Sequence, residues 1–151
     1  MAAATHSSIL TAAGTAITAL ALASAGTALP VVKRFGFTPD WARAASLPCI
    51  SYGPTGILAP IKEDSLKRDT GYPLTIRHLS ASDKETPEQG TLYLTHIHTI
   101  REALQEDGLT VAGVHVFQCE LQPGPLIEVE AAALNILSLA LTFNVKVRET
   151  R

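Results

Sequence analysis

The histidines are the residues in this chain whose chemistry first invites a functional interpretation, since imidazole binds metals and moves protons near neutral pH. There are five of them: His6, His78, His96, His98 and His115. On a helix, His96 and His98 would point about 200° apart, so they cannot share a metal ion as an i, i+4 pair can. The chain has no Cys-x-x-Cys and no His-Glu-x-x-His. We therefore expect no metal site.

The motifs of common catalytic sites are also missing from the sequence. There is no Gly-x-Ser-x-Gly elbow and no phosphate-binding loop, and Gly53-Pro54-Thr55-Gly56 has the wrong glycine pattern for either a phosphate cradle or a dinucleotide site. Glu102 and Glu106 are four residues apart on a predicted helix, which is typical of a solvated face. We expect no catalytic residues and no cofactor, and hence a protein that is not an enzyme.

Length and composition favour one globular domain spanning residues 1–151. The hydrophobic fraction is 46% and the charged fraction 17%, as in a folded protein with its own core. The net charge of −2 gives no overall signal for nucleic-acid binding. Cys49 and Cys119 stand in apolar runs far apart in the chain, so we expect buried free thiols.

The N-terminal segment has two interpretations. Residues 17–25 are apolar, and Ala23-Ser24-Ala25 resembles the cleavage site of a signal peptide, but residues 1–16 contain no Lys or Arg. The run is also too short to span a bilayer, and we expect no membrane partner. The alternative is a first helix from Ser7 or Ser8 to Ala25, ended by Gly26. Its buried stripe would be Leu10, Ala13, Ile17 and Leu20.

Three strands are predicted over residues 29–37, 47–52 and 72–79. In the third, Leu74, Ile76 and His78 share one face, and Thr75 and Arg77 share the other. Residues 56–71 form a charged stretch between the second and third strands, which we interpret as a hairpin arm or a long loop. A solvated connector is its ordinary role, although long loops in small domains often carry function.

A second helix is predicted after Thr86-Pro87 and ends at Asp107-Gly108. Its buried stripe is Tyr93, Ile97, Ile100 and Leu104. A fourth strand follows over residues 111–121, with Val114 and Val116 on one face and His115, Phe117 and Cys119 on the other.

The last strand, over residues 135–148, alternates strictly. Its apolar face is Leu137, Leu139, Leu141, Phe143, Val145 and Val147. Its other face, which we expect to meet water or a partner, is Ser138, Ala140, Thr142, Asn144, Lys146 and Arg148. The predicted order is α-β-β-β-α-β-β. It indicates an α+β fold in which two helices pack on one face of a mostly antiparallel sheet of about four to five strands.

This order of elements resembles the tail terminator and neck (head-to-tail joining) proteins of tailed bacteriophages and prophages over nearly the whole chain. The segments that carry the resemblance follow a short first helix. They are Leu29-Pro30-Val31-Val32-Lys33-Arg34, Leu47-Pro48-Cys49-Ile50-Ser51-Tyr52-Gly53-Pro54, Tyr72-Pro73-Leu74-Thr75-Ile76-Arg77-His78, Ile100-Arg101-Glu102-Ala103-Leu104 and Val145-Lys146-Val147-Arg148-Glu149-Thr150-Arg151.

The resemblance implies a virion protein, assembled in the host cytoplasm, that forms a homo-oligomeric ring, commonly a hexamer. Such a ring ends the tail tube, meets the head connector, and lets DNA pass through its lumen without sequence-specific binding. The elements best able to reach a neighbouring subunit are the arm at residues 56–71 and the last strand. The expected interface residues are Lys62, Glu63, Asp64, Lys67, Arg68, Asp69, Lys146, Arg148 and Arg151.

Two other classes of protein remain open. If residues 1–25 are a cleaved signal, the chain is a secreted or periplasmic small α+β binding module. If the histidines do chemistry, it is a small cytosolic enzyme, and replacing His78 or His115 would abolish its activity.

Overall fold

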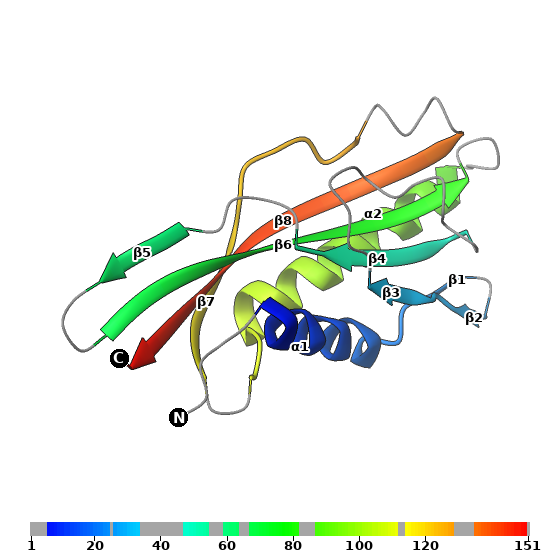
Figure 1. The fold of residues 1–151 in the computed structure, drawn as a ribbon. Coiled ribbons are helices and arrows are strands. Elements are labelled where there is room, and N and C mark those ends of the chain that lie inside the picture. Colours follow the sequence, from blue (N-terminus) through cyan, green and yellow to red (C-terminus); the bar gives the residue numbers. More distant parts are fainter. Residues whose placement is uncertain are drawn as a thin grey trace.

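The protein is an α+β fold built on one long sheet (Figure 1). The computed structural model describes residues 6–24, 26–33, 47–54, 59–63, 67–81, 87–111, 114–128 and 135–150. The strands of the main sheet lie in the order β3 (Val31–Lys33), β4 (Cys49–Gly53), β6 (Lys67–Ala81), β8 (Ile136–Thr150) and β7 (His115–Leu121), and β5 (Ala59–Glu63) pairs with β6.

Both helices, α1 (His6–Ala19) and α2 (Pro87–Glu102), contribute their apolar stripes to the same core against this sheet. The predicted α+β class and its helices are confirmed. The sheet is mixed, because β3 runs parallel to β4 while the other pairs of the sheet are antiparallel.

The centre of the sheet is the antiparallel pair β6 and β8, which runs from Lys67 opposite Thr150 to Ala81 opposite Ile136. The strict alternation of β8 places its apolar side chains on the helix-covered face, as predicted. Beneath them, the predicted helical stripe is buried, with Ile100 fully enclosed. Its last member, Leu104, lies in the π-helical turn η3 (Ala103–Asp107), which continues α2. On α1 the buried positions are Ile9, Leu10, Ala13, Gly14 and Ile17.

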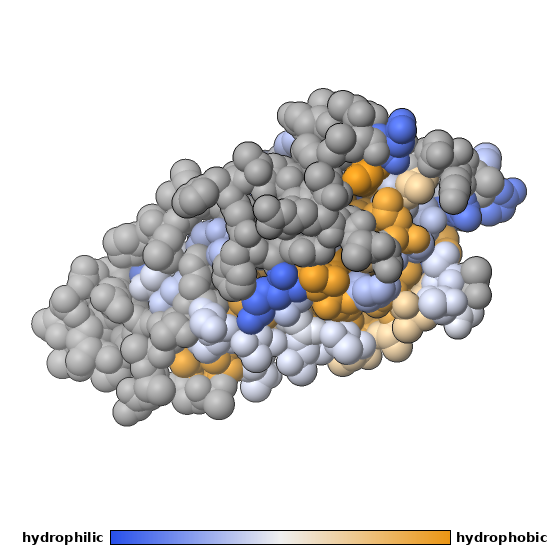
Figure 2. Space-filling view, turned by 45° about the vertical axis from the view of Figure 1, so that its right-hand side comes forward, coloured by the Kyte–Doolittle hydropathy of each residue, from blue (hydrophilic) through white to orange (hydrophobic). Residues whose placement is uncertain are grey.

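The first helix ends earlier than the sequence predicts, at Ala19 instead of Ala25. Ala21 adopts a left-handed conformation (φ 51°), which breaks the helix. Gly26 (φ 79°) does not cap the helix; it belongs to the turn between the short antiparallel strands β1 (Ala23–Ser24) and β2 (Thr27–Ala28). The exposed side of α1 carries Ser7, Thr11, Thr15 and Thr18. In Figure 2 the lower part of the described surface shows pale atoms together with orange, hydrophobic ones.

The charged stretch at residues 56–71 is largely strand rather than loop. β6 begins at Lys67, five residues before the predicted start, and its first residues pair with β5 on one side and β8 on the other. Of the two predicted forms, the hairpin is therefore the observed one; residues 55–58 and 64–66 lie outside the described residues. Figure 1 shows this hairpin, β5 with the start of β6, reaching past the helices at one end of the sheet.

A bulge in β7 changes the predicted faces of that strand after Phe117. Val116 pairs with Val147 and Gln118 with Lys146, so Phe117 is an extra residue in the ladder. The inserted residue shifts the alternation by one position. As a result, Val116 and Cys119 both pack against the core, whereas the sequence places them on opposite faces.

The face of the sheet that lies opposite the helices is also buried in large part. Thr75, Ser51 and Ser138 on this face are all below one-tenth exposed. The prediction that the polar face of the last strand meets water or a partner is therefore wrong at Ser138. Part of the reason is that residues 126–128 run along β8 there, joined to it by hydrogen bonds from Ala140 N to Leu126 O (2.7 Å) and from Glu128 N to Ser138 O (3.0 Å).

Candidate interaction site at the sheet edge

The charged residues predicted to form an interface lie on two neighbouring stretches of the sheet. Asp69 and Arg148 are cross-strand partners, joined by two hydrogen bonds of 2.8 and 3.0 Å between guanidinium and carboxylate. Lys146, two residues earlier on β8, forms an ion pair with Glu120 of β7. Several predicted interface residues are thus already paired within the subunit.

Of the other predicted interface residues, four lie on strands and two lie outside the described residues. Lys62 and Glu63 end β5, and Lys67 and Arg68 begin β6. Asp64 and Arg151 lie outside the described residues. The structure thus brings seven of the nine predicted residues to the β5–β6 hairpin and the adjoining part of β8: Lys62, Glu63, Lys67, Arg68, Asp69, Lys146 and Arg148.

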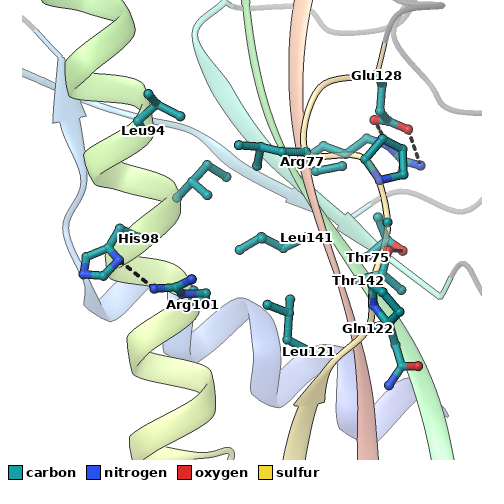
Figure 3. A pocket seen from close by; sticks show the side chains of 16 residues that line it. Thr75, Arg77, Leu94, His98, Arg101, Leu121, Gln122, Glu128, Leu141 and Thr142 are labelled. Carbon is teal, nitrogen blue, oxygen red and sulfur yellow. Dashed lines mark hydrogen bonds and ion pairs between the residues drawn. The ribbon is translucent and has the colours of Figure 1, made fainter.

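A second feature, which the sequence does not reveal, is a cavity of about 490 Å³ at the opposite edge of the sheet. The segment after β7 is hydrogen-bonded to β8 at two points, from Gln122 N to Thr142 O and from Ala140 N to Leu126 O (both 2.7 Å). Residues 123–125 lie between these two points and line the opening of the cavity. We call this cavity the edge pocket. Its lining is mostly aliphatic: Leu94 and Ile97 from α2, Leu121 from β7, Leu141 from β8, and Leu126. Figure 3 shows Leu121 and Leu141 lying between the strands and α2.

The edge pocket is marked by exposed apolar side chains. Leu94 is 50% exposed and Leu126 is 37% exposed, and Ile127, next to the lining, is 52% exposed. These are three of the four large hydrophobic residues that are exposed among the described residues. Exposed apolar residues that cluster around a concavity mark interaction sites in soluble proteins.

Charged side chains at the edge pocket form two groups. Arg77 donates to Glu128 through Nε (2.7 Å) and Nη2 (3.3 Å), and Ser138 donates to the same carboxylate (2.6 Å), so this positive charge is neutralised. Arg101, on the wall formed by α2, contacts the Nδ1 atom of His98 (3.1 Å) and forms no ion pair with a described carboxylate (Figure 3). Glu102 lies on the other side of the same imidazole, 2.8 Å from His98 Nε2, so Arg101, His98 and Glu102 form one polar group on the rim of the edge pocket.

The sequence gives only a weak indication of the edge pocket. Leu94 breaks the polar side of α2, and Gln122-Pro123-Gly124-Pro125 predicts a departure from the strand. Nothing in the sequence indicates that these two segments meet, because their contact depends on how α2 crosses the sheet.

The histidines do not form a metal site among the described residues, where no group of three His, Cys, Asp or Glu side chains comes together. Two of them do meet: Nε2 of His78 lies 3.1 Å from Nδ1 of His96 in the core. The ring of Tyr93 is tilted by 41° against that of His78, with the ring centroids 4.7 Å apart. Burial, with a smaller effect of His96, lowers the pKa of His78 to about 4. Burial also lowers the pKa of His96. Both rings are thus neutral at neutral pH and belong to the packing of β6 against α2.

The cysteines are buried free thiols, as predicted. Burial raises the pKa of Cys119 to about 11, which leaves its thiol protonated and weakly nucleophilic. No helix in the described part of the chain has the length and apolar character needed to cross a membrane.

Comparison with known proteins gives a likeness of fold. No protein-family model and no curated protein matches this chain. Among solved structures, the chain is similar to a chain of the structure "Virion of native gene transfer agent (GTA) particle", with a TM-score of 0.59 and 15% sequence identity. The match covers 93% of this chain and 98% of that chain. The two proteins share a fold over nearly their whole lengths.

Proposed function

We propose that this protein is a structural component of a tailed-phage virion, forming a ring at the head–tail junction that terminates the tail tube and joins it to the head connector. The observation that carries the proposal is the full-length likeness of fold to a chain from a gene transfer agent virion. The resemblance of the sequence pattern to tail terminator and neck proteins points the same way. In this proposal the protein has no active site, and its function resides in its surfaces.

Ring formation requires two different, complementary patches on each subunit, because a heterologous interface closes only by rotation. The subunit offers two such candidates at opposite edges of its sheet. One is the β5–β6 hairpin with Lys62, Glu63, Lys67 and Arg68, and the other is the edge pocket. The remaining predicted partners, the tail tube and the head connector, would meet the two open ends of the ring.

The position of α1 weighs against the alternative of a secreted binding module. Cleavage after Ala25 would remove the whole of α1, including Ile9, Leu10 and Ile17, which are at most 1% exposed. A cleaved segment does not ordinarily supply the core of the mature protein, so we retain the virion role.

Deleting the gene from the genetic element that encodes the protein tests this role. We expect tails that do not join to heads and that vary in length, seen by electron microscopy of the particles, with normal particles restored by the gene supplied in trans. Mass spectrometry of purified wild-type particles should detect the protein in a few copies per particle. Normal particles from the deletion strain, or absence of the protein from wild-type particles, would refute the proposal.

A further inference from the structure

We infer that the edge pocket receives the side chain of Phe117 from a second copy of this chain. The inference rests on the proposed ring, and it names the contact through which neighbouring subunits join. Four large hydrophobic side chains are exposed among the described residues. Three of them, Leu94, Leu126 and Ile127, lie at or beside the edge pocket, and the fourth is Phe117. A contact between the ring of one copy and the edge pocket of another would cover both apolar features at once.

Phe117 is exposed because of the bulge in β7. The ladder with β8 skips it, and Val116 and Cys119 on either side pack against the core, while Phe117 itself is 39% exposed. The guanidinium of Arg148 lies 5.2 Å from the centroid of its ring, and two hydrogen bonds to Asp69 hold that guanidinium in place. Bulges re-aim side chains in this way at functional sites. An aromatic ring that is already held in one orientation loses little conformational entropy on binding, as an anchor residue should.

The edge pocket suits an aromatic ring in both size and chemistry. Its volume of about 490 Å³ lies within the range of about 300–1,000 Å³ that encloses whole ligands, so a phenyl ring can enter it. Leu94, Leu121 and Leu141 provide aliphatic walls. Arg101 lies on the wall formed by α2 (Figure 3), and a guanidinium attracts the electron-rich face of an aromatic ring without needing a hydrogen-bond acceptor. The charge on this wall is thus complementary to an aromatic occupant.

Phe117 does not reach the edge pocket of its own chain. Gln122, which lines the edge pocket, is five residues farther along the same extended segment, a distance of about 16 Å. The contact must therefore join two copies. Because the ring and the edge pocket are different parts of one surface, the contact is heterologous, and heterologous contacts close into a ring when the rotation between copies allows it. This is the type of interface that the proposed ring requires.

Self-association of the full-length protein, measured by analytical ultracentrifugation over a concentration series, tests the contact. Phe117→Ser removes the ring, and Leu94→Asp places a charge in the edge pocket. We expect each to weaken association by about tenfold or more, as for central interface residues. Gln118→Ser and Thr95→Asp are the matched controls, because Gln118 and Thr95 are exposed beside the two test positions and do not line the edge pocket. Both controls should associate like the wild type.

Mixing the two test variants shows whether Phe117 and the edge pocket are partners. The Phe117→Ser chain keeps an intact edge pocket, and the Leu94→Asp chain keeps its ring. An equimolar mixture should therefore form one-to-one dimers at concentrations at which each variant alone is monomeric. Association should stop at the dimer, because only one intact contact is available to each pair.

Photocrosslinking locates the occupant without removing an apolar group. The photoreactive amino acid p-benzoylphenylalanine, incorporated at position 117, keeps an aromatic side chain there. On irradiation it should crosslink to a second chain within the peptides that contain Leu94 or Leu126, as identified by mass spectrometry. All variants should keep the circular dichroism and unfolding midpoint of the wild type, and if Leu94→Asp lowers the midpoint, Leu126→Asp replaces it.

The outcomes separate this inference from the proposed function. The inference is overturned if both test variants associate like the wild type, or if their mixture stays monomeric. It is also overturned if crosslinks from position 117 lie elsewhere on the second chain or on another protein, in solution or in assembled particles. None of these results bears on the virion role, which the deletion strain and the content of purified particles decide separately.

Discussion

Nε2 of His78 on β6 lies 3.1 Å from Nδ1 of His96 on α2, and both side chains are buried. One of the two rings must donate and the other accept, so the contact requires that at least one of them be neutral. The pair links the central strand to the helix that covers it and makes the packing of this layer sensitive to acid.

Stability should fall as the pH drops from about 6.5 to about 4. The pKa of His78 is lowered to about 4 in the folded state, mainly by burial, against 6.5 when exposed. Between these values His78 binds a proton in the unfolded chain but not in the folded one. The stability that depends on neutral His78 is therefore fully present above pH 6.5 and is lost as the pH approaches 4. The loss from His78 alone is on the order of 3 kcal/mol.

Denaturant unfolding at several pH values measures this slope, and His78→Phe should flatten it. The control is His98→Gln, because the side chain of His98 is 54% exposed. An unchanged slope in His78→Phe would mean that other groups govern the response to acid.

Truncating the buried stripe of α2 should destabilise the fold. Ile100 is fully buried beneath the sheet, so Ile100→Ala should lower the free energy of unfolding by about 2–5 kcal/mol. Leu94→Ala removes a similar volume from the same helix at a half-exposed position and should cost less than about 1 kcal/mol. Urea melts of both variants give the comparison, and equal losses would contradict the burial of this stripe.

Gly14→Ala should destabilise the protein even though alanine favours helices. A Cβ at this position on α1 would lie 2.7 Å from Cζ of Tyr52 on β4, so helix and strand must separate or the ring must move. Overpacking of this kind costs about 1–3 kcal/mol, which exceeds the gain of about 1 kcal/mol in helix propensity. Gly124→Ala is the control, because a Cβ there meets nothing within 4 Å. A thermal melt showing Gly14→Ala to be more stable than the wild type would contradict this contact.

The ion pair between Asp69 and Arg148 should matter more than the one between Lys146 and Glu120. Asp69 is 7% exposed and accepts two hydrogen bonds from the guanidinium, so Arg148→Ala removes two charge-assisted hydrogen bonds from a buried carboxylate. We expect a loss of about 1–3 kcal/mol. Glu120 is far more exposed, and Lys146→Ala should cost about 1 kcal/mol or less.

The two losses are measured by urea unfolding at low and high salt. The effect of Lys146→Ala should shrink in salt more than that of Arg148→Ala, since exposed pairs are screened more strongly. The reverse order would show that Asp69 does not depend on Arg148.

The sequence by itself determined the elements whose pattern is local and strongly periodic. The stripe of α2 and the alternation of β8 predicted both the elements and their buried faces, because burying one apolar face is the main stabilising term available to each. The turn at Gly108, with φ 71°, was likewise readable from Asp107-Gly108.

Only the tertiary structure decided the features that depend on a neighbour. The bulge at Phe117 follows from the register of β7 on β8, and the early start of β6 follows from pairing with β5 and β8, which lets charged residues enter a strand. The contact of His78 with His96 and the edge pocket between Leu94 and Leu126 join segments far apart in the chain. Periodicity records which face of an element is apolar; it holds no information on which other segment will lie against that face.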